Sequence, residues 1–432
     1  MKTPALSRRS LLKTAAAAGA ALRQPSLPPW LPDAVRAEAE SLSARSSYHF
    51  ADMAPAAVEA LYGKTLPLSA SKLDCFAGCR YAFFLQYGLR ALPWKQAEFD
   101  APLFGSFVHD VLEHVVREAQ AQGGFAALTD AQVAALTERC MDACMQTYLP
   151  QGDARASREG YLSTRNRQEA AAVVLDVARE LRLSQFTPAA EELTFAPGGQ
   201  MPPIVYHASR GDGLLTGKID RVDTYEKDGT TYFRIVDYKT GRKDFSYTDL
   251  LYGKDLQMLL YLFALQENQK KSGHPMQPAG ALYVPGRCDM IRLEPGEDAG
   301  EADAERRKQL RRKGLVLQDE AILQAMEHYD GEPQYLPVQL KKDGLTGDLA
   351  TPAQLAALER FVTGQVAAMI DEILSGKTQP NPVDRGPADS ACRWCDYSSA
   401  CHKDVCAVSP RRFAAVKADE FWQEIERRQR HG

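Results

Sequence analysis

The spacing of apolar side chains predicts helices over much of the first half of the chain. Between Phe104 and Ala119 they recur every three or four residues, which is typical of a helix that buries one stripe. Ser69 and Ser71 are both suitable N-caps for the helix before it. The helices that we predict are Lys72–Tyr87, Phe104–Ala119, Ala131–Tyr148, Arg167–Leu183, Lys254–Asn268 and Pro352–Leu374.

The middle of the chain changes to a strand pattern. We predict two strands, Leu214–Tyr225 and Thr231–Thr240, because the segment between them contains Asp228-Gly229, a dipeptide favoured in tight hairpin turns. A short apolar run at Ala281–Val284 predicts a further strand. Charged residues dominate 290–313, which is either an insertion or a solvated helix.

Length and charge limit the classes of protein. A chain of 432 residues suffices for one large domain or two of medium size. The net charge of −4 gives no global attraction for DNA, so DNA binding would need local basic patches. One basic run is either such a patch or a solvated helix face: Arg306, Arg307, Lys308, Arg311, Arg312 and Lys313. No run of apolar residues approaches the roughly 20 that a membrane span needs.

Residues 1–65 are rich in Ala, Pro and Arg, which predicts an appendage to the main domain. Within them, Arg8-Arg9 and the Ala-rich run to Leu22 are similar to a twin-arginine export signal. Arg23 and Pro25 follow directly, so a longer apolar stretch with a small-residue cleavage site is missing. We therefore favour an Ala-rich helix that belongs to an upstream region.

Two acidic residues and a lysine in the predicted hairpin are candidates for a metal site. Side chains two apart on a strand share a face, so Asp237 and Lys239 point the same way and Asp220 can reach them from the partner strand. Carboxylates suit a hard ion such as Mg²⁺ that activates water against phosphorus, and the lysine can orient that water. A lone Asp-x-Lys is more often a surface pair, but Gln257 and Tyr261, one helical turn apart, favour the catalytic interpretation.

The chain has nine cysteines, an odd number that does not suit a secreted disulfide framework. Cys392, Cys395 and Cys401 lie within ten positions, whereas a zinc or iron–sulfur site needs four ligands. Cys406 or His402 could complete a zinc site, and ordinary free cysteines are the remaining alternative. Cys140 and Cys144 share one helix face and are expected in the core.

Three segments resemble the PD-(D/E)XK nuclease superfamily, in particular its RecB/AddB-type branch. They are Gly217-Lys218-Ile219-Asp220-Arg221-Val222-Asp223, Val236-Asp237-Tyr238-Lys239-Thr240-Gly241 and Gln257-x-x-x-Tyr261. The resemblance implies an α/β fold, with a restriction-endonuclease-like mixed central sheet flanked by helices and a largely helical surround. It also implies that Asp220 and Asp237 bind Mg²⁺ or Mn²⁺ and that Lys239 is catalytic, while Gln257 and Tyr261 shape the site and face DNA.

A helical histidine is a further metal ligand in this family. The segment Phe104-Gly105-Ser106-Phe107-Val108-His109 matches that block, so the resemblance makes His109 the candidate ligand. A lone histidine is usually a surface or core residue, but Gly105, one turn earlier, would leave space beside it.

The resemblance further implies a [4Fe–4S] cluster held by one cysteine before the nuclease core and three after it. Leu68-Ser69-Ala70-Ser71-Lys72-Leu73-Asp74, Cys79 and the aromatic residues that follow match the early block, although Arg80 stands where proline is frequent. The implied ligands are Cys79, Cys392, Cys395 and Cys401, with Cys75 as the competitor of Cys79. Such a cluster would clip distant parts of the chain together in a structural role.

Residues from about 60 to 425 look like the C-terminal nuclease region of AddB-type proteins. The implied domains are a helicase-like remnant (1–65), the nuclease domain with its cluster (66–410) and a charged helical tail (411–432). The implied function is a cytoplasmic, metal-dependent deoxyribonuclease, an exonuclease on single-stranded ends in double-strand break repair and recombination.

The sequence has no Gly-x-x-x-x-Gly-Lys-Ser/Thr motif. We therefore expect either that an AddA-like helicase partner supplies the motor or that the chain is a truncated gene product. The alternatives are a CRISPR-adaptation-type exonuclease, which is usually much shorter, an inactive cluster-bearing DNA-binding scaffold, and an exported iron–sulfur protein.

Overall fold

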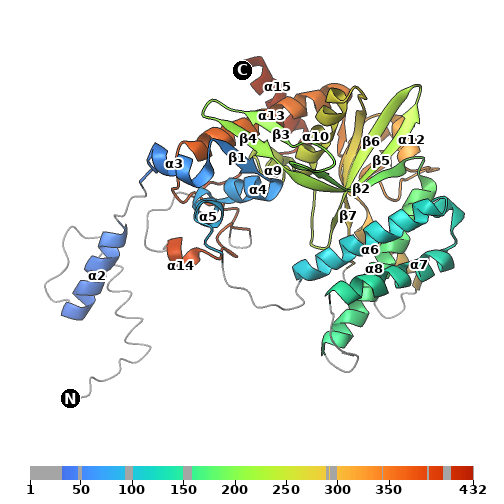
Figure 1. The fold of residues 1–432 in the computed structure, drawn as a ribbon, viewed down its shortest axis with the longest axis horizontal. Coiled ribbons are helices and arrows are strands. Elements are labelled where there is room, and N and C mark those ends of the chain that lie inside the picture. Colours follow the sequence, from blue (N-terminus) through green and yellow to red (C-terminus); the bar gives the residue numbers. More distant parts are fainter. Residues whose placement is uncertain are drawn as a thin grey trace. The chain divides into compact units, whose positions relative to one another are not determined.

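The computed structural model describes residues 32–46, 51–92, 101–148, 158–288, 291, 299–342, 344–386, 389–401 and 410–431 (Figure 1). By packing, the chain divides into two units. Unit 1 comprises residues 1–63, 75–93 and 372–413, and unit 2 comprises residues 64–74, 94–371 and 414–432. This is a division by packing, so the domain limits at residues 65 and 410 stay predictions. Among the described helices, none combines the length and the apolar character that crossing a membrane requires.

Unit 2 is built on a six-stranded mixed sheet in the order β11-β8-β7-β6-β5-β2. Strand β5 runs antiparallel to both its neighbours, β6 and β7 are parallel, and β8 is antiparallel to β7. The strands are β2 (Thr187–Phe195), β5 (Gly217–Lys227), β6 (Thr230–Lys239), β7 (Gln277–Pro285), β8 (Lys313–Leu317) and β11 (Leu349–Ala350). This mixed sheet, flanked by helices, confirms the predicted fold class.

The predicted hairpin is confirmed. Strands β5 and β6 pair from Lys227 opposite Thr230 onwards, which leaves a two-residue turn. Asp228 and Gly229 in that turn have φ values of 52° and 76°, the positive values that a type I′ hairpin requires.

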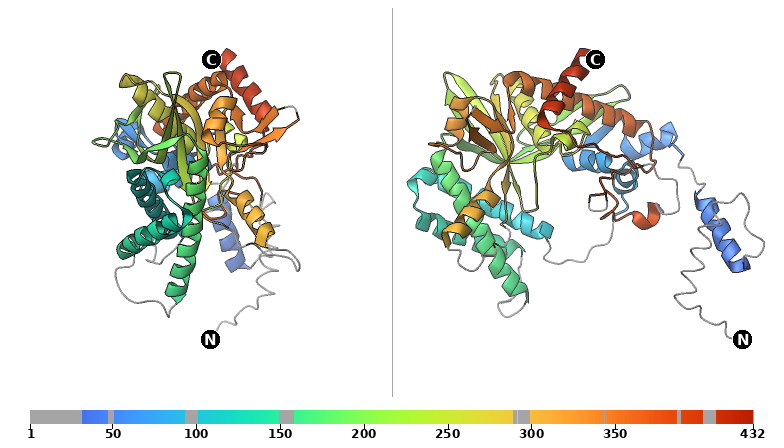
Figure 2. Two further views of the ribbon diagram at one scale, coloured as in Figure 1. Left: turned by 90° about the vertical axis from the view of Figure 1, so that its right-hand side faces the viewer. Right: turned by 180° about the vertical axis from the view of Figure 1, so that it is seen from behind.

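Helices cover both faces of the sheet (Figures 1 and 2). On one face, α6 (Ala101–Ala121), α7 (Asp130–Tyr148) and α8 (Arg158–Leu183) form a buried apolar cluster with Val236 and Tyr238 of β6. Side chains alternate along a strand, so Asp237 points to the other face, where α10 (Gln257–Lys271) packs on β5, β6 and β7. The other helices of unit 2 are α9 (Tyr247–Leu251), α11 (Ala299–Leu310), α12 (Glu320–Met326), most of α13 (Pro352–Leu374) and α15 (Ala418–His431).

Two small sheets complete unit 2. Strands β1 (Thr65–Leu68), β4 (Asp212–Leu215) and β3 (Ile204–His207) form one, and the hairpin of β9 (Val338–Lys341) and β10 (Gly344–Gly347) forms the other. The charged tail is more than a solvated helix, because Phe421, Trp422 and Ile425 of α15 are buried.

Unit 1 is helical and irregular. It contains α2 (Asp33–Ser46), α3 (Pro55–Tyr62), the end of α4 (Ala70–Gly78), α5 (Arg80–Phe83), the π-helical turn η1 (Phe84–Gly88) and α14 (Ser398–Cys401). Phe83 packs against the rings of Tyr62 and Phe76. Met53 N donates a hydrogen bond to Gly376 O (2.9 Å), which ties the two ends of this unit together.

The predicted helix Lys72–Tyr87 is wrong in its continuity. Ser69 Oγ accepts a hydrogen bond from Lys72 N (3.3 Å), as expected of an N-cap, but the helix ends at Gly78. Cys79 is extended (φ −165°, ψ 124°), and a second short helix begins at Arg80. In the charged segment 290–313, the described residues form α11 and the start of β8. Cys140 and Cys144 are buried, as predicted.

Candidate functional site

Three carboxylates lie in a row across three neighbouring strands of unit 2. Pairing of Arg221 with Val236 places Asp220 of β5 beside Asp237 of β6. On the other side of β5, Glu191 pairs with Arg221 and Leu193 pairs with Ile219, so Glu192 of β2 lies opposite Asp220. Paired residues share a face of the sheet, so all three acids point the same way.

Helix α6 adds a histidine to this row. His109 Nδ1 lies 3.3 Å from Asp220 Oδ2, and His109 Nε2 lies 2.6 Å from the carbonyl oxygen of Tyr238. One ligand atom each from His109, Glu192 and Asp220 lie within 4.8 Å of one another. A Cβ at Gly105 would lie 3.1 Å from Thr240 Oγ1, so this glycine allows α6 to approach the end of β6 closely.

Asp237 is held from the opposite side by α10. Its Oδ1 accepts a hydrogen bond from Gln257 Nε2 (2.8 Å), and Lys239 Nζ donates to Gln257 Oε1 (3.3 Å). The other oxygen, Oδ2, lies 2.7 Å from Lys239 Nζ, yet it is buried and receives no well-directed hydrogen bond. A buried carboxylate oxygen with spare acceptor capacity, next to an imidazole and two more carboxylates, fits a divalent cation with oxygen and nitrogen ligands.

The charges of the site perturb its pKa values. Burial, together with the charge of Asp220, raises the pKa of Asp237 to about 6, although Lys239 and His109 act against this. Burial lowers the pKa of His109, but the hydrogen bond and charge of Asp220, with the charge of Asp237, outweigh burial and raise it overall. A bound cation would replace these protons, so the site is built for positive charge.

Sequence reasoning missed Glu192 as a site residue. Strand β2 was not predicted, and nothing in the Glu191-Glu192 pair marks the second residue as special. In the structure Glu192 has a φ of 52°, an unusual value for a non-glycine residue inside a strand, and its carboxylate is paired with Lys218. Strained conformations of this kind cluster at functional sites, where surrounding structure enforces them.

Four cysteines of unit 1 line one pocket. They are Cys79, Cys392, Cys395 and Cys401, and the rest of the lining includes Tyr81, Ala82, Pro380, Pro382 and Ala391. The thiol of Cys75 instead donates to Gln86 Oε1 (3.5 Å) and is absent from this lining. Of the alternatives for a fourth ligand, His402 and Cys406 lie outside the described residues.

Backbone contacts fix the extended Cys79 next to the later cysteines. Arg80 N donates to Asn381 Oδ1 (3.0 Å), across 301 residues of sequence, and Val383 N donates to Gly78 O (2.9 Å). The guanidinium of Arg411 donates to Asn381 O (2.9 Å) and to Ala77 O. The break in the helix at Cys79 is therefore what exposes its thiol to the pocket.

Comparison with known proteins decides the family. A model of the PD-(D/E)XK nuclease superfamily matches residues 67–402, most of the chain. The chain belongs to this nuclease superfamily. The resemblance found in the sequence motifs is therefore confirmed at the level of the superfamily.

Individual relatives are all named as the same component of an ATP-dependent helicase/deoxyribonuclease, its B subunit. The protein of Acetivibrio thermocellus is 32% identical over 375 residues, which cover 84% of this chain and 32% of that protein. Those of Thermoanaerobacter sp. (strain X514) and Clostridium kluyveri are each 31% identical, and the matches cover 86% and 85% of this chain and 33% of each relative. The chain thus spans about one third of the length of these relatives.

The nuclease motifs also place charges in the core. Asp223 accepts hydrogen bonds from Arg221 Nε (2.8 Å) and NH2 (3.0 Å) and from Arg234 Nε (2.8 Å), and all three side chains are fully buried. Arg221 NH1 also donates to the hydroxyl of Tyr238 (2.6 Å). Since the peptide N–H of Tyr238 donates to Asp220 Oδ2 (2.9 Å) and its carbonyl contacts His109, this buried network supports the metal site from below.

Two predicted contributors to DNA binding are less exposed than expected. Tyr261 is buried, and its ring packs edge-on against Phe195. This arrangement suits a residue that shapes the site and leaves little of it to face DNA. Arg312 is also buried, where it pairs with Asp176 and Glu180, so the basic run is not a continuous patch.

Proposed function

We propose that this chain is the nuclease region of a helicase–nuclease complex and that it hydrolyses DNA phosphodiester bonds with Mg²⁺ or Mn²⁺. The observation that supports this most is the row Glu192–Asp220–Asp237 with His109 at one end and Lys239 at the other. Acidic ligands and a lysine at one position are what metal-assisted phosphoester hydrolysis requires.

His109, Glu192, Asp220 and Asp237 would hold the cation. When bound, it would supply charge neutralisation at the scissile phosphate and lower the pKa of a nearby water. The Lys239 ammonium, beside Asp237, is positioned to donate to a phosphate oxygen or to orient the attacking water. Gln257 bridges Asp237 and Lys239, so its amide keeps the acid and the amine in register.

The four cysteines that line one pocket support a [4Fe–4S] cluster as a second, structural group. Ligands of one zinc ion at about 2.3 Å can be at most about 4.6 Å apart. Among the described residues no three thiols lie within 4.8 Å of one another. The wider spacing favours a cluster of several irons, which would hold Cys79 against the segment that carries Cys392 to Cys401.

The names of the relatives support DNA as the substrate and a helicase as the partner. We propose that an AddA-like protein supplies the motor and that a single-stranded end, freed by unwinding, reaches the acidic row in a double-strand break repair pathway. Such a substrate also implies a cytoplasmic location.

The test is cleavage of end-labelled single-stranded and duplex oligonucleotides by the purified full chain in Mg²⁺. We expect Asp237→Asn and Lys239→Ala to reduce the cleavage rate by roughly 10²–10⁴-fold. Asp228→Asn, which removes the same charge in the hairpin turn of the same strands, should leave the rate unchanged. Equal cleavage by all variants would remove the proposal, and an inactive native chain that still binds DNA would favour the scaffold alternative.

A further inference from the structure

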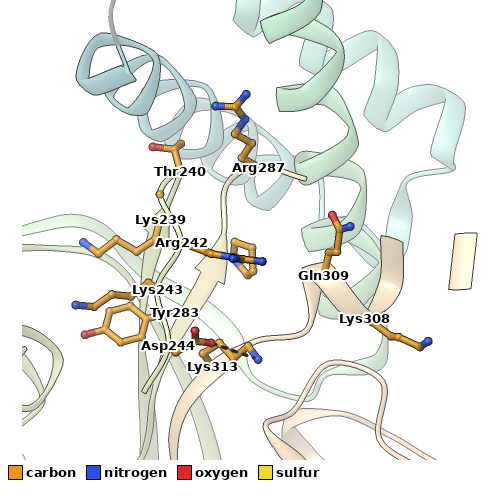
Figure 3. A pocket seen from close by; sticks show the side chains of 12 residues that line it. Lys239, Thr240, Arg242, Lys243, Asp244, Tyr283, Arg287, Lys308, Gln309 and Lys313 are labelled. Atoms are coloured by element: carbon orange, nitrogen blue, oxygen red, sulfur yellow. Dashed lines mark ion pairs between the residues drawn. The ribbon is translucent and has the colours of Figure 1, made fainter. Parts of the chain in front are cut away.

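A pocket of about 330 Å³ opens beside Lys239 (Figure 3). The segment that follows β6 contributes Thr240 to Asp244, and the end of β7 contributes Tyr283 and Arg287. Lys308 of α11 and Lys313 of β8 close the opposite wall. Every one of these residues belongs to unit 2, and Lys239 belongs both to this lining and to the acidic row.

The lining is strongly basic although the chain as a whole carries a net charge of −4. Asp244 is the acid among the described lining residues, and the cations are Lys239, Arg242, Lys243, Arg287, Lys308 and Lys313. Four of these cations have an acid near them outside or at the edge of the pocket: Lys243–Asp255 (2.5 Å), Arg287–Glu169 (3.2 Å), Lys308–Glu305 (3.3 Å) and Lys313–Asp244 (3.6 Å).

These pairs do not neutralise the pocket. Glu169 is shared between Arg287 and Arg165 (2.8 Å), so it balances one of two charges. Arg242 is exposed, and in the described parts of the chain no acidic side chain lies within ion-pair distance of it. An excess of positive charge in a concave site attracts an anion, and a guanidinium matches the geometry of a phosphate.

The same lining offers little for recognition of a base. Tyr283 is the aromatic residue among the described lining side chains, and it is buried, with Lys243 Nζ 5.7 Å from its ring centre. Stacking of bases needs an exposed ring face. The pocket therefore suits the backbone of a nucleic acid, independent of its sequence.

We propose that this basic pocket binds the backbone phosphate next to the scissile one, on the strand that is cut. The inference rests on the proposed nuclease function. Lys239 ends at the scissile position and also lines the pocket, so a strand with one phosphate per nucleotide brings the neighbouring phosphate to Arg242 and Lys308. This contact sets which bond of the strand meets Asp237.

The test combines a protein variant with a change in the DNA. Arg242→Ala/Lys308→Ala removes two cations of the pocket, and Lys341→Ala/Lys342→Ala removes two exposed lysines at β9 as the matched control. Binding of a fluorescent single-stranded oligonucleotide is measured by anisotropy over a range of salt concentrations without Mg²⁺. We expect the slope of log affinity against log salt to fall in magnitude by about 1.4 in the pocket variant, since each contact to a single strand contributes about 0.7.

Oligonucleotides in which one phosphodiester is replaced by an uncharged methylphosphonate locate the contact. In the native chain and in the control, one internal replacement next to the cut bond should weaken binding and slow cleavage, whereas in the pocket variant the same replacement should have no further effect. Additive effects of protein and DNA changes, an effect of terminal phosphates alone, or a pocket variant that behaves like the control would overturn the proposal. If the native chain binds with this coupling but does not cut, the pocket assignment stands and the nuclease proposal fails.

Discussion

Removal of Asp223 should destabilise unit 2 far more than removal of an exposed acid. Its carboxylate accepts three hydrogen bonds, of 2.8, 3.0 and 2.8 Å, from two fully buried guanidinium groups. Asp223→Ala would leave Arg221 with only the hydroxyl of Tyr238 and Arg234 with only Glu180, 3.1 Å away. Loss of one partner of a buried ion pair costs about 3–5 kcal/mol, because the remaining charges are desolvated without compensation.

Glu180 cannot take over the role of Asp223. Burial alone would raise the pKa of Glu180, but the charges of Arg312, Arg234 and Arg221 lower it to about 2. Glu180 is therefore already ionised, and it already accepts hydrogen bonds from Arg312 Nε (3.0 Å) and NH2 (2.7 Å). Asp223→Asn keeps the shape and one acceptor, so it should cost less, about 1.5–3 kcal/mol.

The assay is urea unfolding at neutral pH, followed by circular dichroism and by tryptophan fluorescence, in which the buried Trp422 reports on unit 2. Glu226→Ala, an exposed acid on the same strand, is the control and should change the free energy of unfolding by less than about 0.5 kcal/mol. A loss below about 1 kcal/mol for Asp223→Ala would refute the view that this network is a closed set of buried ion pairs.

Three further predictions concern the two metal-binding regions. Glu192→Gln should weaken Mn²⁺ binding by roughly 10-fold or more, measured by calorimetry; unchanged affinity would show that Glu192 serves only its pair with Lys218. Mn²⁺ affinity of the native chain should fall as the pH is lowered through about 6, because protons then occupy Asp237 and His109, whose pKa values are raised; an affinity constant from pH 8 to pH 5 would contradict this. Cys79→Ser should lose iron from anaerobically purified protein, which otherwise holds about four irons per chain, whereas Cys75→Ser should keep it; zinc in place of iron would overturn the cluster.

The hairpin could be predicted from the sequence because its determinants are local. Asp228-Gly229 fixes the turn, the two-residue period fixes the faces, and together they bring Asp220 to Asp237 and Lys239. The helix Pro352–Leu374 was predicted with the limits that the structure has, since its apolar period is long and regular.

The rest depends on contacts between residues far apart in the sequence. Strand β2 is an edge strand without a continuous apolar pattern, so neither the strand nor the placement of Glu192 could be predicted. The break at Cys79 depends on Asn381 and Arg411, which bind the chain on either side of it. The burial of Arg312 likewise requires Asp176 and Glu180 of α8, which no local pattern reveals.

The central claim is that a divalent cation binds at Asp220, and titration of Mn²⁺ followed by electron paramagnetic resonance tests it most directly. The free-ion signal of Mn²⁺ should be depleted by one ion per native chain at neutral pH. Asp220→Asn should abolish that depletion, while Asp228→Asn on the same hairpin should retain it. Equal depletion by the native chain and by Asp220→Asn would contradict the account.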